Sequence, residues 1–389
     1  MEKQKKRNMF TASYVGVAAV WLGSHFGPGF ATGSFSTTYY VRYGWIGILT
    51  PLLAMLVTGG VMYFMAEYAR AHQTFNYRPF ALSCFGPKAG PVMSVLYDVA
   101  FIMTLLCAGG LAFSGEANIL KQAFGCPYWL GAGAMILLSG LLCMYGSRLM
   151  ARTSAYMMYA IIFVVLLIVV LSFIFGKYDL AGAFANSAAN AKNPDMLQAI
   201  RSALLYGCFQ STIVFNVMSV SDVLESRKET KKAIGFGYVA TVILMIGMVL
   251  MLFSYTNVMD IVGDINHGKQ NLLPVMTVLQ GLGFQWLTYL YIILMTLAVL
   301  TSAAGLAQAS VRRFDGLFKG IENLQARRFV ITCIALGIAA LGASFGMGNI
   351  LRKGTAWVGY FGIPVVVIPA FTWVAYRVHK DGKSEEKSA

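Results

Sequence analysis

The chain has 389 residues, of which 58% are hydrophobic and 12% are charged, and its formal net charge is +14. Because an ordinary soluble domain carries about 25% charged residues, this composition excludes a soluble globular protein and indicates a polytopic membrane protein. The basic excess is compatible with a nucleic-acid partner, but the positions of the lysines and arginines explain it as membrane topology.

Apolar runs of about twenty residues predict ten membrane-spanning helices. They cover roughly residues 9–41, 43–69, 89–118, 127–147, 152–175, 199–223, 233–258, 283–311, 327–346 and 354–377. The basic residues 1–7 lead directly into the first run. That run is long and has no small-residue cleavage pattern, so we interpret it as a span rather than a signal peptide.

The distribution of basic residues predicts the side of the membrane on which each loop lies. If the first residues lie in the cytoplasm, 22 of the 30 lysines and arginines fall in cytoplasmic segments and 8 in outer segments. The positive-inside rule then places both termini in the cytoplasm. The predicted organisation is a cytoplasmic N-terminus (1–8), a first five-helix repeat (9–175), an extracellular loop (176–198), a second five-helix repeat (199–377) and a cytoplasmic tail (378–389).

Two of the predicted spans are interrupted by polar and glycine residues. Five spans in each half make the second half enter the membrane in the opposite sense, which is the condition for an inverted repeat. The first span contains "SHFGPGFATG" at 24–33, and the sixth contains "SALLYGCFQSTIVFNVMS" at 202–219, where residues 206–212 interrupt the apolar run. Interruptions at corresponding positions of the two halves predict a binding site near mid-membrane.

This pattern resembles the LeuT fold of the amino acid–polyamine–organocation (APC) superfamily. The stretch "HFGPGFATG" is similar to the "GAGFASG" type of start in YkvI-like membrane proteins, a branch described as amino acid permeases. The resemblance implies an all-α fold in which spans 1 and 6 unwind halfway and hold the substrate. It also implies that a bundle of spans 1, 2, 6 and 7 rocks against a scaffold of spans 3, 4, 8 and 9. The location that it implies is the inner (plasma) membrane of a bacterium.

The resemblance further implies a sodium site between spans 1 and 8. Span 8 reads "LAVLTSAAG" and fits the family's A-x-x-[TS]-[TS] arrangement. The implied ligands are the carbonyls of Gly23, Phe26 and Ala298 and the hydroxyls of Thr301 and Ser302. Such oxygens suit a hard cation, although small hydroxyl residues are also common at ordinary helix contacts. Span 5 lacks the lysine that replaces sodium in some proton-coupled relatives, which favours sodium as the coupling ion.

The predicted substrate site combines residues from both interruptions. They are Ser24, His25, Gly27, Pro28 and Gly29 from span 1 and Phe209, Gln210 and Ser211 from span 6. Free amides and the positive end of a half-helix favour a carboxylate, although the proline removes one donor. The histidine has three possible roles: to contact the solute, to carry a proton, or to bond a freed carbonyl. The phenylalanine is equally well explained as core.

Carboxylates inside the membrane are candidates for gating or proton transfer. Asp98 and Glu116 both lie on span 3, about 27 Å apart at 1.5 Å per residue, so they do not share a site. Glu67 and Asp222 lie near cytoplasmic basic residues, which favours ion pairing. Tyr39, Tyr40 and Trp357 are interpreted as interfacial aromatics, with packing at an outer gate as the alternative.

We therefore predict a sodium-coupled symporter of an amino acid or a similar small polar solute. Two alternatives are a proton-coupled carrier or exchanger on the same fold, and a nutrient-binding receptor that does not transport. No H-E-x-x-H metalloprotease motif is present, and the six cysteines show no C-x-x-C spacing. Hence no enzyme, no organic cofactor and no nucleic-acid partner is expected, and the predicted partners are the solute, sodium and the lipid bilayer.

Overall fold

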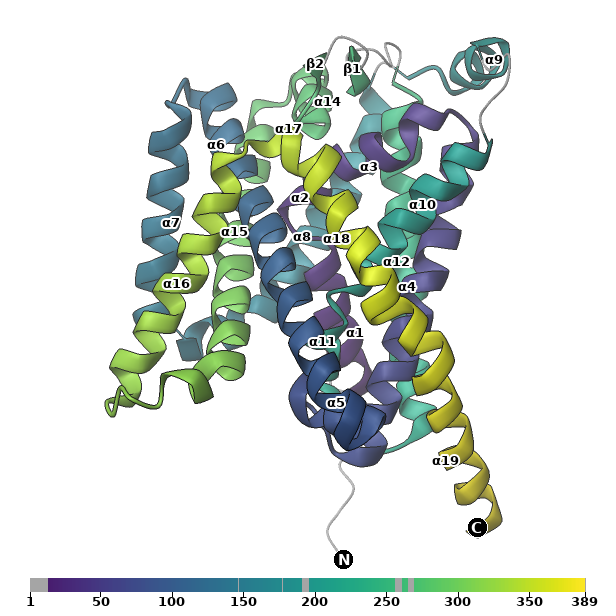
Figure 1. Cartoon of the computed structure of the whole chain (residues 1–389). Helices are drawn as coiled ribbons and strands as arrows, with labels where there is room; N and C mark the ends of the chain where they lie inside the picture. The colour runs from purple at the N-terminus through teal and green to yellow at the C-terminus, as the bar shows by residue number, and fades with distance from the viewer. Residues whose placement is uncertain are drawn as a thin grey trace, which may run out of the picture.

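Helices make up almost all of the computed structural model, as expected for a chain that must satisfy its backbone polar groups within hydrocarbon. The structure describes residues 13–145, 147–176, 178–190, 196–255, 261–264 and 269–388. One end of the molecule is formed where α1 begins and α19 ends, and we call it the terminal face (Figure 1). The opposite end carries α9, α14 and the β1–β2 pair, and we call it the loop face (Figure 1).

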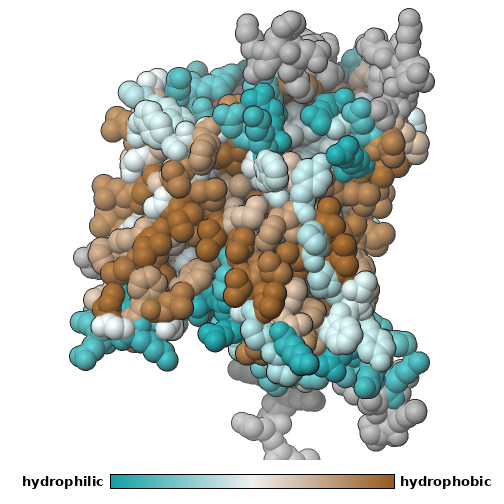
Figure 2. Space-filling model, viewed as in Figure 1, coloured by the Kyte–Doolittle hydropathy of each residue, from teal (hydrophilic) through white to brown (hydrophobic). Residues whose placement is uncertain are grey.

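The surface between these two faces is apolar. In the view of Figure 2, hydrophobic residues form a broad belt, and hydrophilic residues gather at the loop face and the terminal face. In the described part of the chain, six helices are long and apolar enough to cross a membrane, or seven if the bent pair 196–211 and 214–223 is one span. The chain is therefore an integral membrane protein, and the count of ten spans stays a prediction.

The first predicted span consists of three short helices rather than one. They are α1 (Ser13–His25), α2 (Pro28–Ala31) and α3 (Ser34–Tyr39). The first interruption is caused by Pro28, which has no N–H to donate to the preceding turn and begins α2. The second is made by Gly33, whose φ of 81° is easily adopted only by glycine.

The sixth predicted span is also bent, by 40° between α10 (Met196–Ser211) and α11 (Val214–Met218). The break lies at residues 212–213, so most of the predicted interruption at 206–212 is still helical. Gly207 lies within α10, where the missing side chain lets the helix approach the backbone of α4 (Ile46–His72) closely: a Cβ on Gly207 would lie 2.6 Å from the Ala54 carbonyl oxygen.

The third predicted span begins earlier than expected. The structure forms α5 (Tyr77–Thr104), a π-helical turn η3 (Leu105–Gly109) and α6 (Gly110–Phe124), whereas the predicted span covered 89–118. Arg78 and Lys88 indicated a loop in the sequence, but residues between them are helical and bury Phe80 and Cys84. Gly86, with φ 76°, kinks this first part of α5.

The remaining elements complete the chain. They are η2 (Val41–Tyr43), α7 (Tyr128–Tyr145), α8 (Ser147–Phe175), α9 (Leu180–Asn190), η4 (Ser221–Val223), α12 (Arg227–Phe253), β1 (Gly263–Asp264), β2 (Lys269–Gln270), α14 (Pro274–Leu282), α15 (Gln285–Phe314), η5 (Asp315–Phe318), α16 (Leu324–Ser344), α17 (Met347–Asn349), η6 (Ile350–Gly354), α18 (Thr355–Gly362), η7 (Ile363–Val367), η8 (Ala370–Val374) and α19 (Ala375–Ser388). The two strands pair antiparallel, with Gly263 opposite Gln270.

The helices pack in two groups. In the first group α4 packs against α10, α11 and α12, and α1 packs against α11 and α12. In the second group α6, α7, α15 and α16 pack against one another. These groups correspond to the expected bundle of spans 1, 2, 6 and 7 and the expected scaffold of spans 3, 4, 8 and 9.

Trp21 joins three helices of the bundle. Its side chain on α1 is fully buried, and its ring lies between Gly59 of α4 and Gly237 of α12. A Cβ built on Gly237 would lie 2.5 Å from a ring carbon of Trp21, and a Cβ on Gly59 would lie 3.5 Å from another. Gly237 therefore makes the space in which the indole ring fits, whereas a Cβ on Gly59 would only reach van der Waals contact with the ring.

Candidate functional site

The first interruption of span 1 leaves several backbone carbonyls without their helical donors, among them those of Gly23 and Phe26. In a continuous helix the Gly23 oxygen would accept from Gly27 N–H, and the Phe26 oxygen from Phe30 N–H. Here Phe30 N–H donates to the Gly27 oxygen instead, and no described donor reaches the oxygens of Gly23 and Phe26. These are the two span-1 carbonyls that were expected to bind sodium.

Helix α15 lies beside this interruption. A Cβ built on Gly27 would lie 3.9 Å from the Ser302 hydroxyl oxygen, and the Tyr291 hydroxyl donates to the Ala31 carbonyl at 3.2 Å. Ala298 is buried on the same helix. The side chain of Thr301 lies outside the described part of the structure. The structure thus brings Ser302 close to the released carbonyls.

The two interrupted spans meet through direct hydrogen bonds. The Asn216 side-chain amide on α11 donates to the Ser24 hydroxyl at 3.2 Å. On the other side of the break, the Gln210 side-chain amide donates to the Tyr206 hydroxyl at 2.9 Å, and that hydroxyl lies 3.4 Å from His25 Nε2. Ser24, His25 and Gln210 were predicted from the sequence, whereas Tyr206 and Asn216 were not assigned a role.

These contacts fit a neutral His25 that accepts at Nε2. The Tyr206 oxygen accepts from Gln210, so its own hydrogen is available for His25 Nε2, and in that arrangement the imidazole proton is on Nδ1. His25 is buried, and its Nδ1 has no hydrogen-bond partner among the described residues. A buried donor without an acceptor is costly, so a ligand that supplies an acceptor here would gain binding energy.

Aromatic rings enclose this part of the site. Five rings lie within 6.2 Å of the Tyr206 ring, centroid to centroid: His25, Phe35, Tyr39, Tyr40 and Phe209. The Tyr39 hydroxyl lies 2.6 Å from the Thr355 hydroxyl on α18. Tyr39 and Tyr40 are buried, so their interpretation as interfacial aromatics was wrong, whereas Trp357 is 68% exposed.

Ser211 and Phe209 have structural partners. The Ser211 hydroxyl donates to the Gly207 carbonyl at 2.7 Å, and the Thr58 hydroxyl of α4 donates to the same oxygen at 3.1 Å. The first of these bonds runs from a side chain to the carbonyl one turn earlier in α10, a pattern that often accompanies a bend in a helix. Phe209 packs against Phe35 with ring centroids 5.7 Å apart. Gly29 packs closely against Phe35, because a Cβ there would lie 2.7 Å from its ring.

The intramembrane carboxylates are separated as expected. Asp98 forms a bidentate ion pair with Arg313 at the end of α15, and the guanidinium also stacks over the Tyr77 ring at 4.2 Å. Glu67 pairs with Arg70 at 2.7 Å, in agreement with the ion-pair interpretation. Glu116 is fully buried on α6, where one of its oxygens lies 2.5 Å from the Thr296 hydroxyl.

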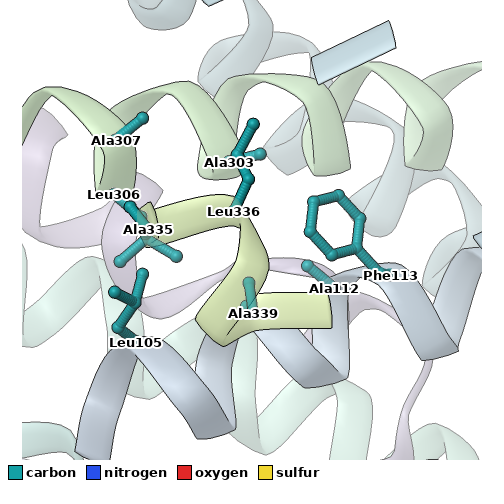
Figure 3. A pocket seen from close by; sticks show the side chains of 10 residues that line it. Leu105, Ala112, Phe113, Ala303, Leu306, Ala307, Ala335, Leu336 and Ala339 are labelled. Atoms are coloured by element: carbon teal, nitrogen blue, oxygen red, sulfur yellow. The ribbon is translucent and has the colours of Figure 1, made fainter. Parts of the chain in front are cut away.

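A narrow apolar crevice lies within the scaffold, away from the interruptions. It is lined by residues of η3, α6, α15 and α16, among them Leu105, Phe113, Ala303, Ala335 and Ala339 (Figure 3). Small side chains allow these helices to approach closely. The lining has no polar side chain, so we assign it to helix packing.

Comparison with known proteins gives one relative by sequence. The chain is 23% identical over 234 residues to the membrane protein YkvI of Bacillus subtilis (strain 168), and the match covers 59% of this chain. It covers 63% of YkvI, which is less than two thirds of that relative's length. No family model matches the chain. The resemblance to YkvI-like proteins that the first span suggested is confirmed.

Solved structures establish the fold. A Na+-coupled sialic acid symporter superimposes with a TM-score of 0.64 at 15% identity, covering 94% of this chain and 90% of the symporter. MhsT in complex with L-phenylalanine superimposes with a TM-score of 0.63 at 14% identity, covering 94% of this chain and 89% of MhsT. The manganese transporter of Eremococcus coleocola superimposes with a TM-score of 0.54 at 17% identity, covering 92% of this chain and 78% of the transporter. The chain has the LeuT fold, with the breaks in the first and sixth helices that the sequence predicted.

Proposed function

We propose that the chain is a sodium-coupled secondary transporter of an amino acid or a similar small zwitterionic solute. The observation that carries this proposal is the position of the Ser302 hydroxyl beside the break that releases the carbonyls of Gly23 and Phe26. Sodium is a hard cation and prefers several oxygen ligands. We assign its ligands as these two carbonyls, the Ala298 carbonyl, and the hydroxyls of Thr301 and Ser302.

The solute site lies next to this cation site, around His25. The imidazole N–H at Nδ1 and the Gly27 amide are both without a described acceptor, and together they suit a carboxylate. The aromatic rings around Tyr206 limit the size of the solute that can enter. We therefore assign the carboxylate to the side of Ser24, His25 and Gly27 and the remainder of the solute to the side of Phe209 and Gln210.

Transport would follow from movement of the bundle against the scaffold. The sodium ligands come from α1 of the bundle and α15 of the scaffold, so a bound ion links the two groups. Each positive charge that moves inward along the membrane potential contributes about 2.3 kcal/mol per 100 mV. We place the terminal face in the cytoplasm, in agreement with the sorting of basic residues.

Thermal stability of the purified protein in detergent tests the sodium site. The protein is heated in sodium chloride or in choline chloride at equal ionic strength, as wild type and as Ser302→Ala. An ion that binds only the folded state stabilises it, by about 2.7 kcal/mol at a hundred times its Kd. We expect a sodium-specific rise in Tm for the wild type that Ser302→Ala loses or that requires far more sodium.

The same helix supplies a matched control. Ser310 is buried on α15 and its hydroxyl donates to the Leu306 carbonyl, so Ser310→Ala removes an equivalent hydroxyl away from the break. This variant should keep the sodium-specific rise. If sodium and choline give the same melting curves for the wild type at every concentration, the sodium site is refuted.

Uptake into liposomes then separates transport from sensing. Amino acids and related zwitterions are screened for a further rise in Tm in sodium, and those that bind are tested for sodium-driven accumulation in vesicles. Accumulation that depends on the sodium gradient supports a symporter. Binding without flux supports a receptor, and flux driven by a pH gradient without sodium supports a proton-coupled carrier.

A further inference from the structure

Glu116 is a buried carboxyl group that the proposed sodium and solute sites do not use. It lies on α6, the part of the third span that is nearer the loop face (Figure 1), and its residue surface is 0% exposed. One carboxyl oxygen, Oε1, lies 2.5 Å from the Thr296 hydroxyl of α15, and the other, Oε2, has no hydrogen-bond partner in the described structure.

The hydroxyl of Thr296 shows which protonation state fits this arrangement. It lies 2.5 Å from Glu116 Oε1 and 3.0 Å from the Ile292 carbonyl oxygen, but it has only one hydrogen to donate. Both short contacts are hydrogen bonds at the same time only if the carboxyl group donates its own proton to Thr296 and Thr296 donates to Ile292. A carboxylate would compete for the single hydroxyl hydrogen and leave its second oxygen charged and unbonded.

The surroundings supply no positive charge to stabilise a carboxylate. No described Lys, Arg or His forms an ion pair with Glu116. The titratable or charged side chains on α6 and on the elements packed against it in this half are Lys121, Tyr128, Tyr289, Tyr291, Arg352 and Lys353. The lysines, the arginine and Tyr289 are exposed, and no described hydrogen bond joins any of these side chains to the carboxyl group. A buried, unpaired carboxylate is costly, so the neutral acid is the stable form.

Glu116 lies where the scaffold meets the interrupted first span. The neighbouring Gly115 faces Thr32, since a Cβ on Gly115 would lie 4.0 Å from the Thr32 methyl group. Tyr291, on the same helix as Thr296, donates to the Ala31 carbonyl of α2. Movement of α2 and α3 away from α6 and α15 would therefore change the surroundings of the carboxyl group and admit water to it.

We propose that Glu116 is a proton-binding site, protonated while α2 packs against α6 and α15 and ionised when this contact opens. The proton bonds Thr296 in the closed arrangement and passes to water in the open one. The proposal takes its two conformations from the alternating movement proposed above, but the site itself is independent of which ion drives transport. Acidic solution on the loop face then favours closure of that face.

Infrared spectroscopy of the purified protein tests the protonation state directly. A buried protonated carboxyl group absorbs as a C=O band that a carboxylate lacks. We expect such a band in the wild type at neutral pH and its loss in Glu116→Gln. Glu67→Gln is the matched control, because Glu67 is also buried but is paired with Arg70, so this variant should keep the band. Absence of the band from the wild type, or its full retention in Glu116→Gln, refutes the site.

A second variant keeps the test decisive if Glu116→Gln does not fold. Thr296→Val keeps the carboxyl group and removes its hydrogen-bond acceptor, so the band should persist and shift to higher frequency. An unchanged frequency in the folded variant refutes the assigned bond. Failure of this inference would leave sodium-specific stabilisation intact, and failure of the sodium site would leave the infrared band intact, so the two results are distinguishable.

The link to opening is tested with a thiol at the contact. Thr32 is buried beside Gly115, and Thr32→Cys is labelled with a water-soluble thiol reagent as the pH rises. The labelling rate of Thr32→Cys should rise more steeply with pH when Glu116 is present than in the Glu116→Gln background. Because the thiol ionises in both backgrounds, the comparison corrects for the pH dependence of the thiol itself. Equal slopes refute the coupling of the proton to opening.

Discussion

The indole ring of Trp21, held between Gly59 and Gly237, gives a quantitative test of how the bundle is joined. We expect Gly237→Ala to destabilise the protein, because the new Cβ would lie 2.5 Å from the ring of the fully buried Trp21. Gly235 is the matched control: it lies two residues earlier on α12, is exposed, and has no neighbouring atom within 4 Å of a built Cβ.

The expected magnitude follows from two opposing effects. Replacing glycine by alanine inside a helix stabilises it by about 0.5–1 kcal/mol, and this gain is common to both variants. Overpacking a filled interior costs about 1–3 kcal/mol and applies only to Gly237→Ala. The two variants should therefore differ by about 1–3 kcal/mol, with Gly235→Ala at or above the wild type.

The assay is unfolding in detergent by titration with sodium dodecyl sulfate, followed by the helical circular dichroism signal. Trp21→Phe removes the ring atoms that would clash, and it breaks no described hydrogen bond because the indole N–H has no partner there. In the Trp21→Phe background, Gly237→Ala should approach the effect of Gly235→Ala. Equal effects of the two glycine substitutions in the wild-type background would show that the ring does not join these helices.

Two further predictions concern the polar contacts. Asp98→Asn should lower the free energy of unfolding, measured by the detergent titration, by about 2 kcal/mol. This loss is smaller than the roughly 3–5 kcal/mol for breaking a fully buried ion pair, because Asp98 is a quarter exposed. Adding Arg313→Met to the Asp98→Asn variant should recover part of the loss. Tyr206→Phe should keep sodium-specific stabilisation but weaken solute binding by about 1–3 kcal/mol, since His25 loses the hydroxyl that orients its ring. Titrating the solute against Tm measures this change, and an unaltered affinity would exclude the tyrosine from the site.

The sequence predicted the fold more completely than the side-chain partners. Hydropathy and basic residues locate the spans. Pro28 marks a break because it lacks the N–H that would bond the carbonyl one turn earlier, which is an effect local enough to be read from the sequence. The third span was placed too short because Arg78 and Lys88 resemble loop residues, whereas burial of the helix between them depends on distant parts of the chain.

Contacts between distant residues could not be predicted from local pattern. Tyr206 was noted only as part of an interruption, yet its ring meets those of Tyr39 and Tyr40, more than 160 residues away in sequence. The pairing of Asp98 with Arg313 likewise depends on how α5 and α15 pack. The sequence did contain the signal for Glu116, because a carboxylate within a membrane span is rarely without a role.

Pro28 also affects how tightly ligands bind at the first break. With any other residue at position 28, an N–H could donate to the Ser24 carbonyl, and a continuous helix would compete with the broken one whenever no ion or solute is bound. The measured Kd would then be raised in proportion to the fraction of molecules that had re-formed the helix. Because proline cannot make that bond, the broken form is already the resting form, and little binding free energy is spent on unwinding α1.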